Sequence, residues 1–151
     1  MIESTSGDLL KVDVEALVNA VNYAGVMGKG IALQFKREFP ANFQVYEKAC
    51  RAGNVVPGRM LIHEIGGSLS PRYIINFPTK RHWRAASLVE DVESGLQSLA
   101  DDVRRLNIRS IAVPPLGCGL GGLEWQVVRP MIEQAFDDLP GVRVLLFHPI
   151  N

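Results

Sequence analysis

The strongest constraint on the fold is a pair of glycine-rich segments, residues 25–30 and 117–122. Each follows a short apolar run, at 16–21 and 111–116, and each precedes a helical pattern. Glycine accepts positive φ, so such a turn can direct several backbone N–H groups at one anion, and a helix N-terminus adds the positive end of its dipole. Because two such turns on neighbouring strands would face a single ligand, the sequence predicts a nucleotide with a central diphosphate.

Length and composition exclude several classes of protein. The 151 residues suffice for one domain whose core needs neither metal nor disulfides. Lysine plus arginine equal aspartate plus glutamate at 16 each, so no global charge indicates a nucleic-acid or membrane partner. Cys50 and Cys118 match neither a disulfide framework nor a zinc-ligand set. With no leader pattern and no membrane-length apolar run, we expect a soluble, cytoplasmic domain over residues 1–151, cut from the N-terminal part of a longer chain.

Short apolar runs predict the sheet. Residues 17–21, 111–113 and 142–147 are typical of parallel strands that are covered on both faces. Residues 59–65 and 72–77 flank a loop rich in glycine and proline, which favours a pair of antiparallel neighbours. The sequence therefore predicts a mixed, mostly parallel central sheet.

Apolar residues that recur at intervals of three and four predict the helices between these strands. The clearest stripe comprises Leu88, Val92, Leu96, Leu99, Val103 and Leu106. Ser87 and Glu90 predict a capping box at the start of this helix. Shorter helices are expected on either side of Pro40, and another over 125–136 should either kink at Pro130 or begin there. Helices on both faces of a mixed sheet make a three-layer α/β/α sandwich.

Two familiar nucleotide signatures are excluded. The second glycine segment has the spacing G-x-G-x-x-G, but only one strand follows it, and no acidic residue ends a second strand about 20 residues later, as a dinucleotide-binding fold requires. Gly28-Lys29 resembles part of a P-loop. There, however, Gly30 stands in place of the magnesium-binding serine or threonine, and Tyr23 stands in place of the first glycine.

Ordered motifs along the whole chain carry a resemblance to a known family. They are Gly7-Asp8-Leu9-Leu10, Val18-Asn19-Ala20-Val21-Asn22, Met27-Gly28-Lys29-Gly30-Ile31 and Pro115-Leu116-Gly117-Cys118-Gly119-Leu120. This set resembles the macrodomain, an ADP-ribose-binding module with a three-layer α/β/α sandwich. Residues 76–80, the Gly-Cys-Gly-Leu turn and Trp125 resemble the branch of terminal ADP-ribose protein glycohydrolases and DarG antitoxins, with DarG the closer match.

The resemblance implies an activity. DarG macrodomains remove ADP-ribose that a DarT-type toxin places on thymidine in DNA, so we expect an ADP-ribosyl glycohydrolase that acts as an antitoxin. Its expected partners are ADP-ribose, ADP-ribosylated and mainly single-stranded DNA, and the cognate DarT-type toxin. We expect no cofactor, metal or membrane requirement. Two alternatives stay open: hydrolysis of ADP-ribosyl esters on protein or acetate, and binding of ADP-ribose without turnover.

The resemblance also implies ligand contacts. Asp8 would accept a hydrogen bond from the adenine amine, although a turn or cap role after the first strand is equally compatible with the sequence. Phe147 would wall the adenine, whereas for His148 ordinary edge packing is favoured. The further expected ligand-binding residues are Leu9, Asn19, Gly25, Val26, Met27, Gly28, Gly30, Ile31, Thr79, Pro115, Leu116, Gly117, Cys118, Gly119, Leu120 and Gly121.

Lys80 and Asn22 are the expected catalytic residues. A neutral Lys80 amine can attack the anomeric carbon of the distal ribose or capture its aldehyde as a Schiff base, and burial or the neighbouring Arg81 would favour the neutral form. The alternative is a solvated surface lysine. Asn22 would bond the distal ribose or orient the scissile bond, with Asn19 in support, or else would close the turn.

One departure from the branch concerns the proton carrier. Protein-directed relatives have an aspartate directly after the Gly-Cys-Gly-Leu turn, whereas this chain has Gly121, as DarG-like sequences have a small residue there. No carboxylate pair replaces it. The carrier therefore stays open between water, a substrate phosphate and the base, and Gly121 favours a DNA substrate.

A basic segment beside Lys80 gives a separate indication of the substrate. Arg81, Trp83 and Arg84 combine positive charge with an aromatic ring, which suits phosphate contacts and base stacking on a single strand. The alternative is a charged loop with Trp83 folded onto the core. Cys118 has no histidine near it in sequence, so a packing role is expected rather than a nucleophilic one.

Overall fold

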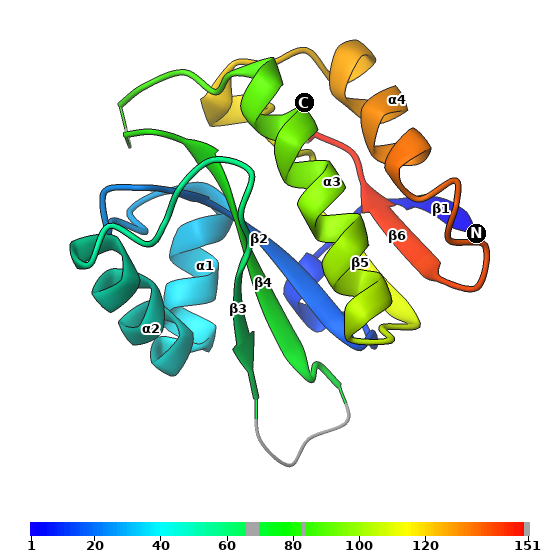
Figure 1. Cartoon of the computed structure of the whole chain (residues 1–151), viewed down its shortest axis with the longest axis horizontal. Coiled ribbons are helices and arrows are strands. Elements are labelled where there is room, and N and C mark those ends of the chain that lie inside the picture. Colours follow the sequence, from blue (N-terminus) through cyan, green and yellow to red (C-terminus); the bar gives the residue numbers. More distant parts are fainter. Residues whose placement is uncertain (66–69, 83, 150–151) are drawn as a thin grey trace.

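The computed structural model describes residues 1–65, 70–82 and 84–149. The strands are β1 (Ile2–Thr5), β2 (Ala16–Asn22), β3 (Leu61–Glu64), β4 (Tyr73–Lys80), β5 (Ser110–Val113) and β6 (Arg143–Phe147). The helices are α1 (Gly30–Glu38), α2 (Pro40–Arg51), α3 (Val89–Arg105) and α4 (Trp125–Ala135), with short 3₁₀ turns η1 (Leu9–Lys11) and η2 (Gly119–Gly121). Figure 1 shows the helices arranged around one twisted sheet.

The sheet has six strands in the order β1-β6-β5-β2-β4-β3. All neighbours are parallel except β3 and β4, which pair antiparallel. The predicted strands at 17–21, 111–113 and 142–147 are β2, β5 and β6, which adjoin one another inside the sheet, as expected. The predicted mixed, mostly parallel sheet is thus confirmed, while part of the loop between β3 and β4 lies outside the described residues.

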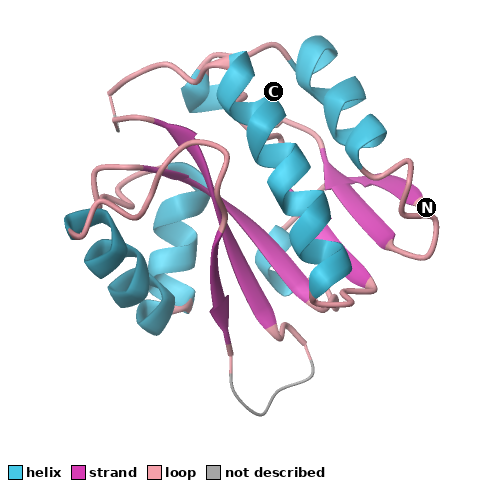
Figure 2. Cartoon of the chain, viewed as in Figure 1, coloured by secondary structure: helices cyan, strands magenta, loops and turns pink. Residues whose placement is uncertain are grey.

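Helices cover both faces of this sheet, because successive side chains of a strand point to opposite faces. On one face, Ile111 and Val113 of β5 belong to a large core cluster with the buried residues of α3 and α4. On the other face, Ala112 of the same strand packs in a cluster with Phe35 of α1. Figure 2 shows the helices on either side of the sheet, which confirms the expected α/β/α sandwich.

Two details of the helices differ from the sequence predictions. The predicted capping box is wrong: α3 begins at Val89 with Leu88 as its N-cap, and no side chain caps it. Ser87 lies before the helix instead, where its backbone N–H donates to the carbonyl of Gly121 (2.9 Å). Helix α4 begins at Trp125 and contains Pro130, so the alternative start at Pro130 is wrong as well.

A shift of register between β2 and β4 positions their carboxyl ends. Val21 pairs with Pro78, but the next residue, Asn22, pairs with Lys80. Thr79 is left without a partner residue in the register, and its hydroxyl donates to the carbonyl of Val21 (3.4 Å). The two predicted catalytic residues are therefore neighbours on adjacent parallel strands, at the edge of the sheet where ligands of α/β proteins bind.

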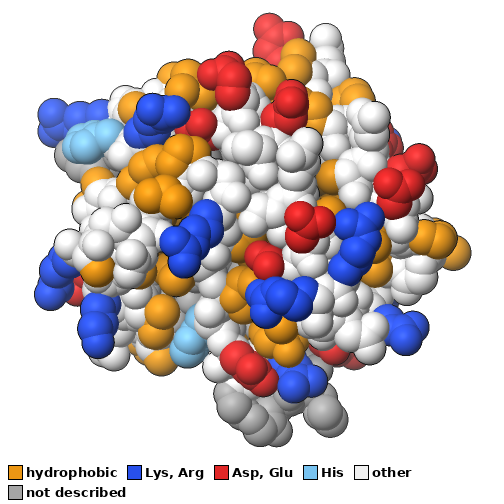
Figure 3. Space-filling model, in the orientation of Figure 1, with side chains coloured by type: hydrophobic (Ala, Val, Ile, Leu, Met, Phe, Trp, Pro, Cys, Tyr) orange, Lys and Arg blue, Asp and Glu red, His pale blue; other side chains and the backbone are white. Residues whose placement is uncertain are grey.

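The segment after β4 carries exposed basic side chains. Figure 3 shows arginine or lysine side chains and a histidine gathered on this part of the surface, where Arg81, His82 and Arg84 are exposed. Trp83, predicted to belong to this group, lies outside the described residues. No helix in the described ranges is both long and apolar enough to cross a membrane.

Candidate functional site

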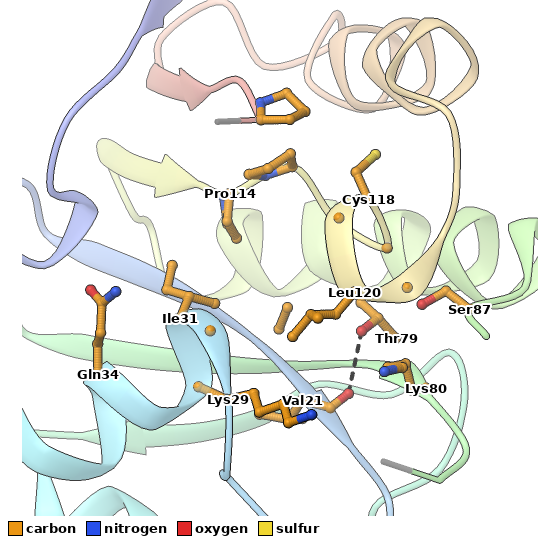
Figure 4. A pocket seen from close by; sticks show the side chains of 18 of the residues that line it. Val21, Lys29, Ile31, Gln34, Thr79, Lys80, Ser87, Pro114, Cys118 and Leu120 are labelled. Carbon is orange, nitrogen blue, oxygen red and sulfur yellow. Dashed lines mark hydrogen bonds between the residues drawn. The ribbon is translucent and has the colours of Figure 1, made fainter. Parts of the chain in front are cut away.

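A cavity of about 1060 Å³ lies at the carboxyl ends of the parallel strands. This volume is close to the upper end of the usual range for small-molecule sites. The lining residues come from the segments 6–9 after β1, 20–22 of β2, 26–34 around the start of α1, 79–87 after β4, 114–121 after β5, and 147–149 after β6. Figure 4 shows labelled side chains from β2, from the start of α1 and from the segments after β4 and β5 around one space.

Polar side chains of β2 and α2 hold the first glycine segment in place. Asn22 accepts from the backbone N–H of Ala24 (2.9 Å) and donates to the carbonyl of Val26 (2.8 Å). The hydroxyl of Tyr46 on α2 donates to Asn22, lying 2.7 Å from its side-chain oxygen and 2.9 Å from its carbonyl. Burial raises the pKa of Tyr46, so this hydroxyl keeps its proton at neutral pH. Asn22 therefore closes the turn, which is the alternative role that its sequence position allows, and it also lines the cavity.

The N-terminus of α1 opens directly onto the cavity. Gly30, Ile31 and Ala32 all line it, and no side chain caps the helix at Lys29. The first N–H groups of a helix have no intrahelical partner, and they attract anions together with the helix dipole. Gly30 adopts φ +60°, a conformation that favours glycine. This end of the first glycine segment is suited to a phosphate.

The second glycine segment turns twice before α4 begins. Gly117, Gly119 and Gly122 adopt φ of +75°, +68° and +81°. The backbone N–H of Leu123 donates to the carbonyl of Gly117 (2.9 Å), which closes the loop around η2. Burial raises the pKa of the Cys118 thiol and thereby disfavours a thiolate, which supports the expected packing role. The described residues contain no group of three or more His, Cys, Asp or Glu side chains that could hold a metal ion.

Lys80 lies half-buried at the end of β4 and lines the cavity across from Asn22. The next residue, Arg81, turns away to the buried carboxylate of Asp91 on α3, with 3.3 Å between Nε and Oδ2. Arg84 lines the cavity, whereas Arg81 is not among its lining residues. With Trp83 outside the described residues, the predicted nucleic-acid rim is supported at Arg84 alone.

The opposite end of the cavity lies after β1 and β6. Asp8 caps η1 by accepting from the backbone N–H of Leu10 (3.0 Å), and it also lines the cavity, so both roles considered for it are compatible with the structure. Phe147 lines the cavity as expected. His148 lines it too, although edge packing was the favoured interpretation of that residue.

Some residues predicted to bind the ligand do not line the cavity: Asn19, Gly25, Met27 and Leu116. Asn19 is fully buried, and its amide donates to Asn76 (3.3 Å) rather than to Asn22. Asn19 and Asn22 are three positions apart, and the alternation of a strand places such residues on opposite faces, so their spacing is no sound basis for expecting Asn19 to support Asn22. Met27 and Leu116 are buried in the core. The cavity is instead lined by residues absent from the prediction, among them Ser6, Lys29, Gln34, Ser87 and Pro114.

A family model for the Macro domain matches residues 18–132. The DNA ADP-ribosyl glycohydrolase of Thermus aquaticus is 52% identical over 151 residues, which are 100% of this chain and 42% of that protein. The solved macrodomain of Mycobacterium tuberculosis DarG is 53% identical, with a TM-score of 0.97 and coverage of 99% of both chains. Thermosipho africanus DarTG in complex with ADP-ribose is 34% identical, with a TM-score of 0.92 over 99% of this chain and 42% of that one. The chain thus spans less than half the length of such full-length relatives.

Proposed function

The chain belongs to the macrodomain family, and from this premise we propose that it hydrolyses the bond between ADP-ribose and thymidine in ADP-ribosylated DNA, as the antitoxin of a DarT-type toxin. One observation carries the proposal. In a chain 52% identical to a DNA ADP-ribosyl glycohydrolase, the cavity at the sheet edge brings the amine-bearing Lys80 opposite Asn22.

The order of the strands supports one direction for ADP-ribose in the cavity. Asp8 follows β1 and Phe147 ends β6, at one side of the sheet, while Lys80 ends β4 on the other side of β5 and β2. The adenine lies at the Asp8 end. The diphosphate crosses the middle, where the N-terminus of α1 faces the second glycine segment. The distal ribose then reaches Lys80.

Lys80 acts as the nucleophile in the proposed reaction. Its amine attacks C1 of the distal ribose, the bond from C1 to the thymine nitrogen breaks, and the base leaves with the electron pair and takes up a proton. Water then hydrolyses the bond between lysine and sugar and releases ADP-ribose. Asp8 is the single carboxylate among the described lining residues, and it lies at the adenine end. The departing base is therefore protonated by water or by the substrate rather than by a carboxylic acid of the cavity.

The test offers thymidine-linked and glutamate-linked ADP-ribose in parallel and measures free ADP-ribose by chromatography. We expect release from the DNA substrate. Release from the glutamate ester alone would identify an ester hydrolase, and binding without release from either substrate would identify an ADP-ribose reader. Both of these outcomes contradict the proposal.

Lys80→Ala tests the mechanism. The loss of the nucleophile should lower release from DNA by about 100-fold or more, while the dissociation constant of ADP-ribose changes by less than about threefold. Lys48→Ala is the matched control, because Lys48 is exposed on α2 and does not line the cavity. Full activity of Lys80→Ala would remove the mechanism. Co-expression with a DarT-type toxin tests the antitoxin role: the wild type should restore growth and Lys80→Ala should not.

A further inference from the structure

Ser87 is a buried polar residue of the cavity that the proposed mechanism leaves without a role. It lies between β4 and α3, is 4% exposed and lines the cavity. Its hydroxyl is buried and has no hydrogen-bond partner among the described residues. Buried hydroxyl groups in folded proteins nearly always have a partner, because an unpaired one lowers stability. The position of Ser87 therefore calls for a ligand that supplies the partner.

The second glycine segment holds this hydroxyl in place. The backbone N–H of Ser87 donates to the carbonyl of Gly121 (2.9 Å). A Cβ atom at Gly121 would lie 2.3 Å from Oγ of Ser87, and one at Gly117 would lie 3.3 Å from its Cβ. Gly121 does not adopt a positive φ, so glycine is needed there to make room for Ser87 rather than for its own conformation. Ser87 thus occupies a recess beside Gly117 and Gly121, where the missing side chain of Gly121 leaves room for its hydroxyl.

The recess lies at the Lys80 end of the cavity. Lys80 ends β4, away from β1 and β6 in the strand order, and Ser87 lies on the chain between this strand and α3. Figure 4 shows the Ser87 hydroxyl directed toward the cavity, near Thr79 and Lys80 in that view. A group bound there is the part of the ligand that meets Lys80, which in ADP-ribose is the distal sugar.

We propose that the Ser87 hydroxyl forms a hydrogen bond with a hydroxyl group of the distal ribose and so orients this sugar toward Lys80. The inference rests on the proposed function, which defines the distal ribose as the reacting sugar. A serine hydroxyl both donates and accepts, as ribose hydroxyls do, so the two groups satisfy each other without any charge. Ser87 is therefore a substrate-binding residue that fixes which atom of the sugar faces the amine.

A pair of ligands isolates this contact. ADP-ribose and ADP share the adenosine and the diphosphate, but ADP lacks the distal ribose. Ser87→Ala should weaken ADP-ribose by about 3- to 10-fold, the usual worth of one hydrogen bond, and leave the dissociation constant of ADP unchanged in calorimetry. Ser94→Ala is the matched control, because Ser94 is an exposed serine of α3 that does not line the cavity. It should change neither value.

Two outcomes would overturn the inference. Equal weakening of both ligands would mean that Ser87 only shapes the second glycine segment. Unchanged binding of both would mean that the hydroxyl is satisfied by water or by the protein. These binding measurements need no DNA. If the wild type binds ADP-ribose but releases none from DNA, the proposed function is contradicted, and the comparison of ADP-ribose with ADP still tests the role of Ser87.

A second pair of variants separates the hydroxyl from the space it fills. Gly121→Ala places a methyl group against Oγ and should weaken ADP-ribose at least as much as Ser87→Ala. Ser87→Gly combined with Gly121→Ala removes the clash, so the melting temperature should recover while ADP-ribose affinity stays about 3- to 10-fold below that of the wild type. Recovery of affinity in the double variant would show that the hydroxyl is not needed.

Discussion

The two glycine segments flank the same cavity but are stabilised in different ways. The first is tied by hydrogen bonds to Asn22, whose side chain is itself bonded to Tyr46. The second is packed against apolar and small side chains: a Cβ at Gly117 would meet Leu123 at 2.6 Å, whereas a Cβ at Gly25 would find its nearest neighbour at an ordinary 3.6 Å. In the first segment glycine serves conformation, and in the second it also serves close approach.

One sequence signal, a glycine-rich segment, therefore has two physical causes in this protein. A glycine retained for positive φ can be replaced at a modest cost, because the extra methyl group has room. A glycine retained for close approach cannot, because the methyl group must displace a neighbour in a packed region. Glycine substitutions that separate backbone strain from close packing therefore test whether the two segments differ in this way.

The largest effect is expected for Gly117→Ala, where both causes act. The residue has φ +75°, and its new Cβ would lie 2.6 Å from Leu123 and 3.3 Å from both Ser87 and Val92. Backbone strain and overpacking together should lower the free energy of unfolding by about 2–4 kcal/mol. Urea denaturation measures this loss. A change below about 1 kcal/mol would mean that the second segment yields as easily as the first.

Tyr46→Phe should have the next largest effect, because it removes the polar support of the first segment. The variant keeps the ring, removes the hydroxyl donor from the carbonyl of Asn22 and leaves its side-chain oxygen with the N–H of Ala24 alone. We expect a loss of about 1–2 kcal/mol in unfolding free energy. ADP-ribose affinity should fall as well, since Asn22, which holds the carbonyl of Val26 and the turn, loses the hydroxyl that positions its side chain. An unchanged stability would show that Asn22 needs no donor from α2.

Gly25→Ala should cost less, about 1 kcal/mol, because strain at φ +81° is its single cause and a stiffer unfolded chain offsets part of it. Gly28→Ala is the control in the same segment. Gly28 has no positive φ, and its new Cβ would lie 3.4 Å from Val26. Thermal unfolding should give Gly28→Ala a melting temperature near that of the wild type; a larger loss at Gly28 than at Gly25 would reverse the argument.

The smallest effect concerns pH. Burial raises the pKa of Tyr46 above its ordinary value of 10.0, so the folded protein retains a proton that the unfolded chain releases. The stability linked to this proton is complete below about pH 10 and is lost as the pH rises through the value in the folded state. Between pH 9 and pH 10.5, the free energy of unfolding should therefore fall less in Tyr46→Phe than in the wild type. Equal slopes would mean that Tyr46 does not contribute.

The sequence predicted those parts of the site that local patterns encode. Residues at strand ends and in glycine segments, such as Lys80, Asp8 and Gly119, line the cavity as expected, because the carboxyl ends of parallel strands meet at one edge. The layers of the sandwich followed from short, continuous apolar runs for the strands and from apolar residues at intervals of three and four for the helices.

The missed features depend on contacts between distant segments. Ser87 has the spacing of a capping residue with Glu90, yet its place is decided by packing under Gly121, which no local pattern reveals. The sequence predicts Arg81 at the nucleic-acid rim, whereas in the structure its side chain pairs with Asp91 on α3. Asn19 was expected to support Asn22, but the two are three positions apart on the strand, and the Asn19 amide donates to buried Asn76 instead.

Thr79, which has no partner residue in the register between β2 and β4, limits how the sequence of β4 can vary. Since each added residue inverts the side of a strand, this single insertion in β4 decides that Lys80 rather than Thr79 stands opposite Asn22. The position of the Lys80 amine is therefore set by the number of residues in β4 and not by the chemistry of any one of them. A strand of the same composition with a regular register would instead pair Thr79 with Asn22 and direct the Lys80 side chain to the opposite face.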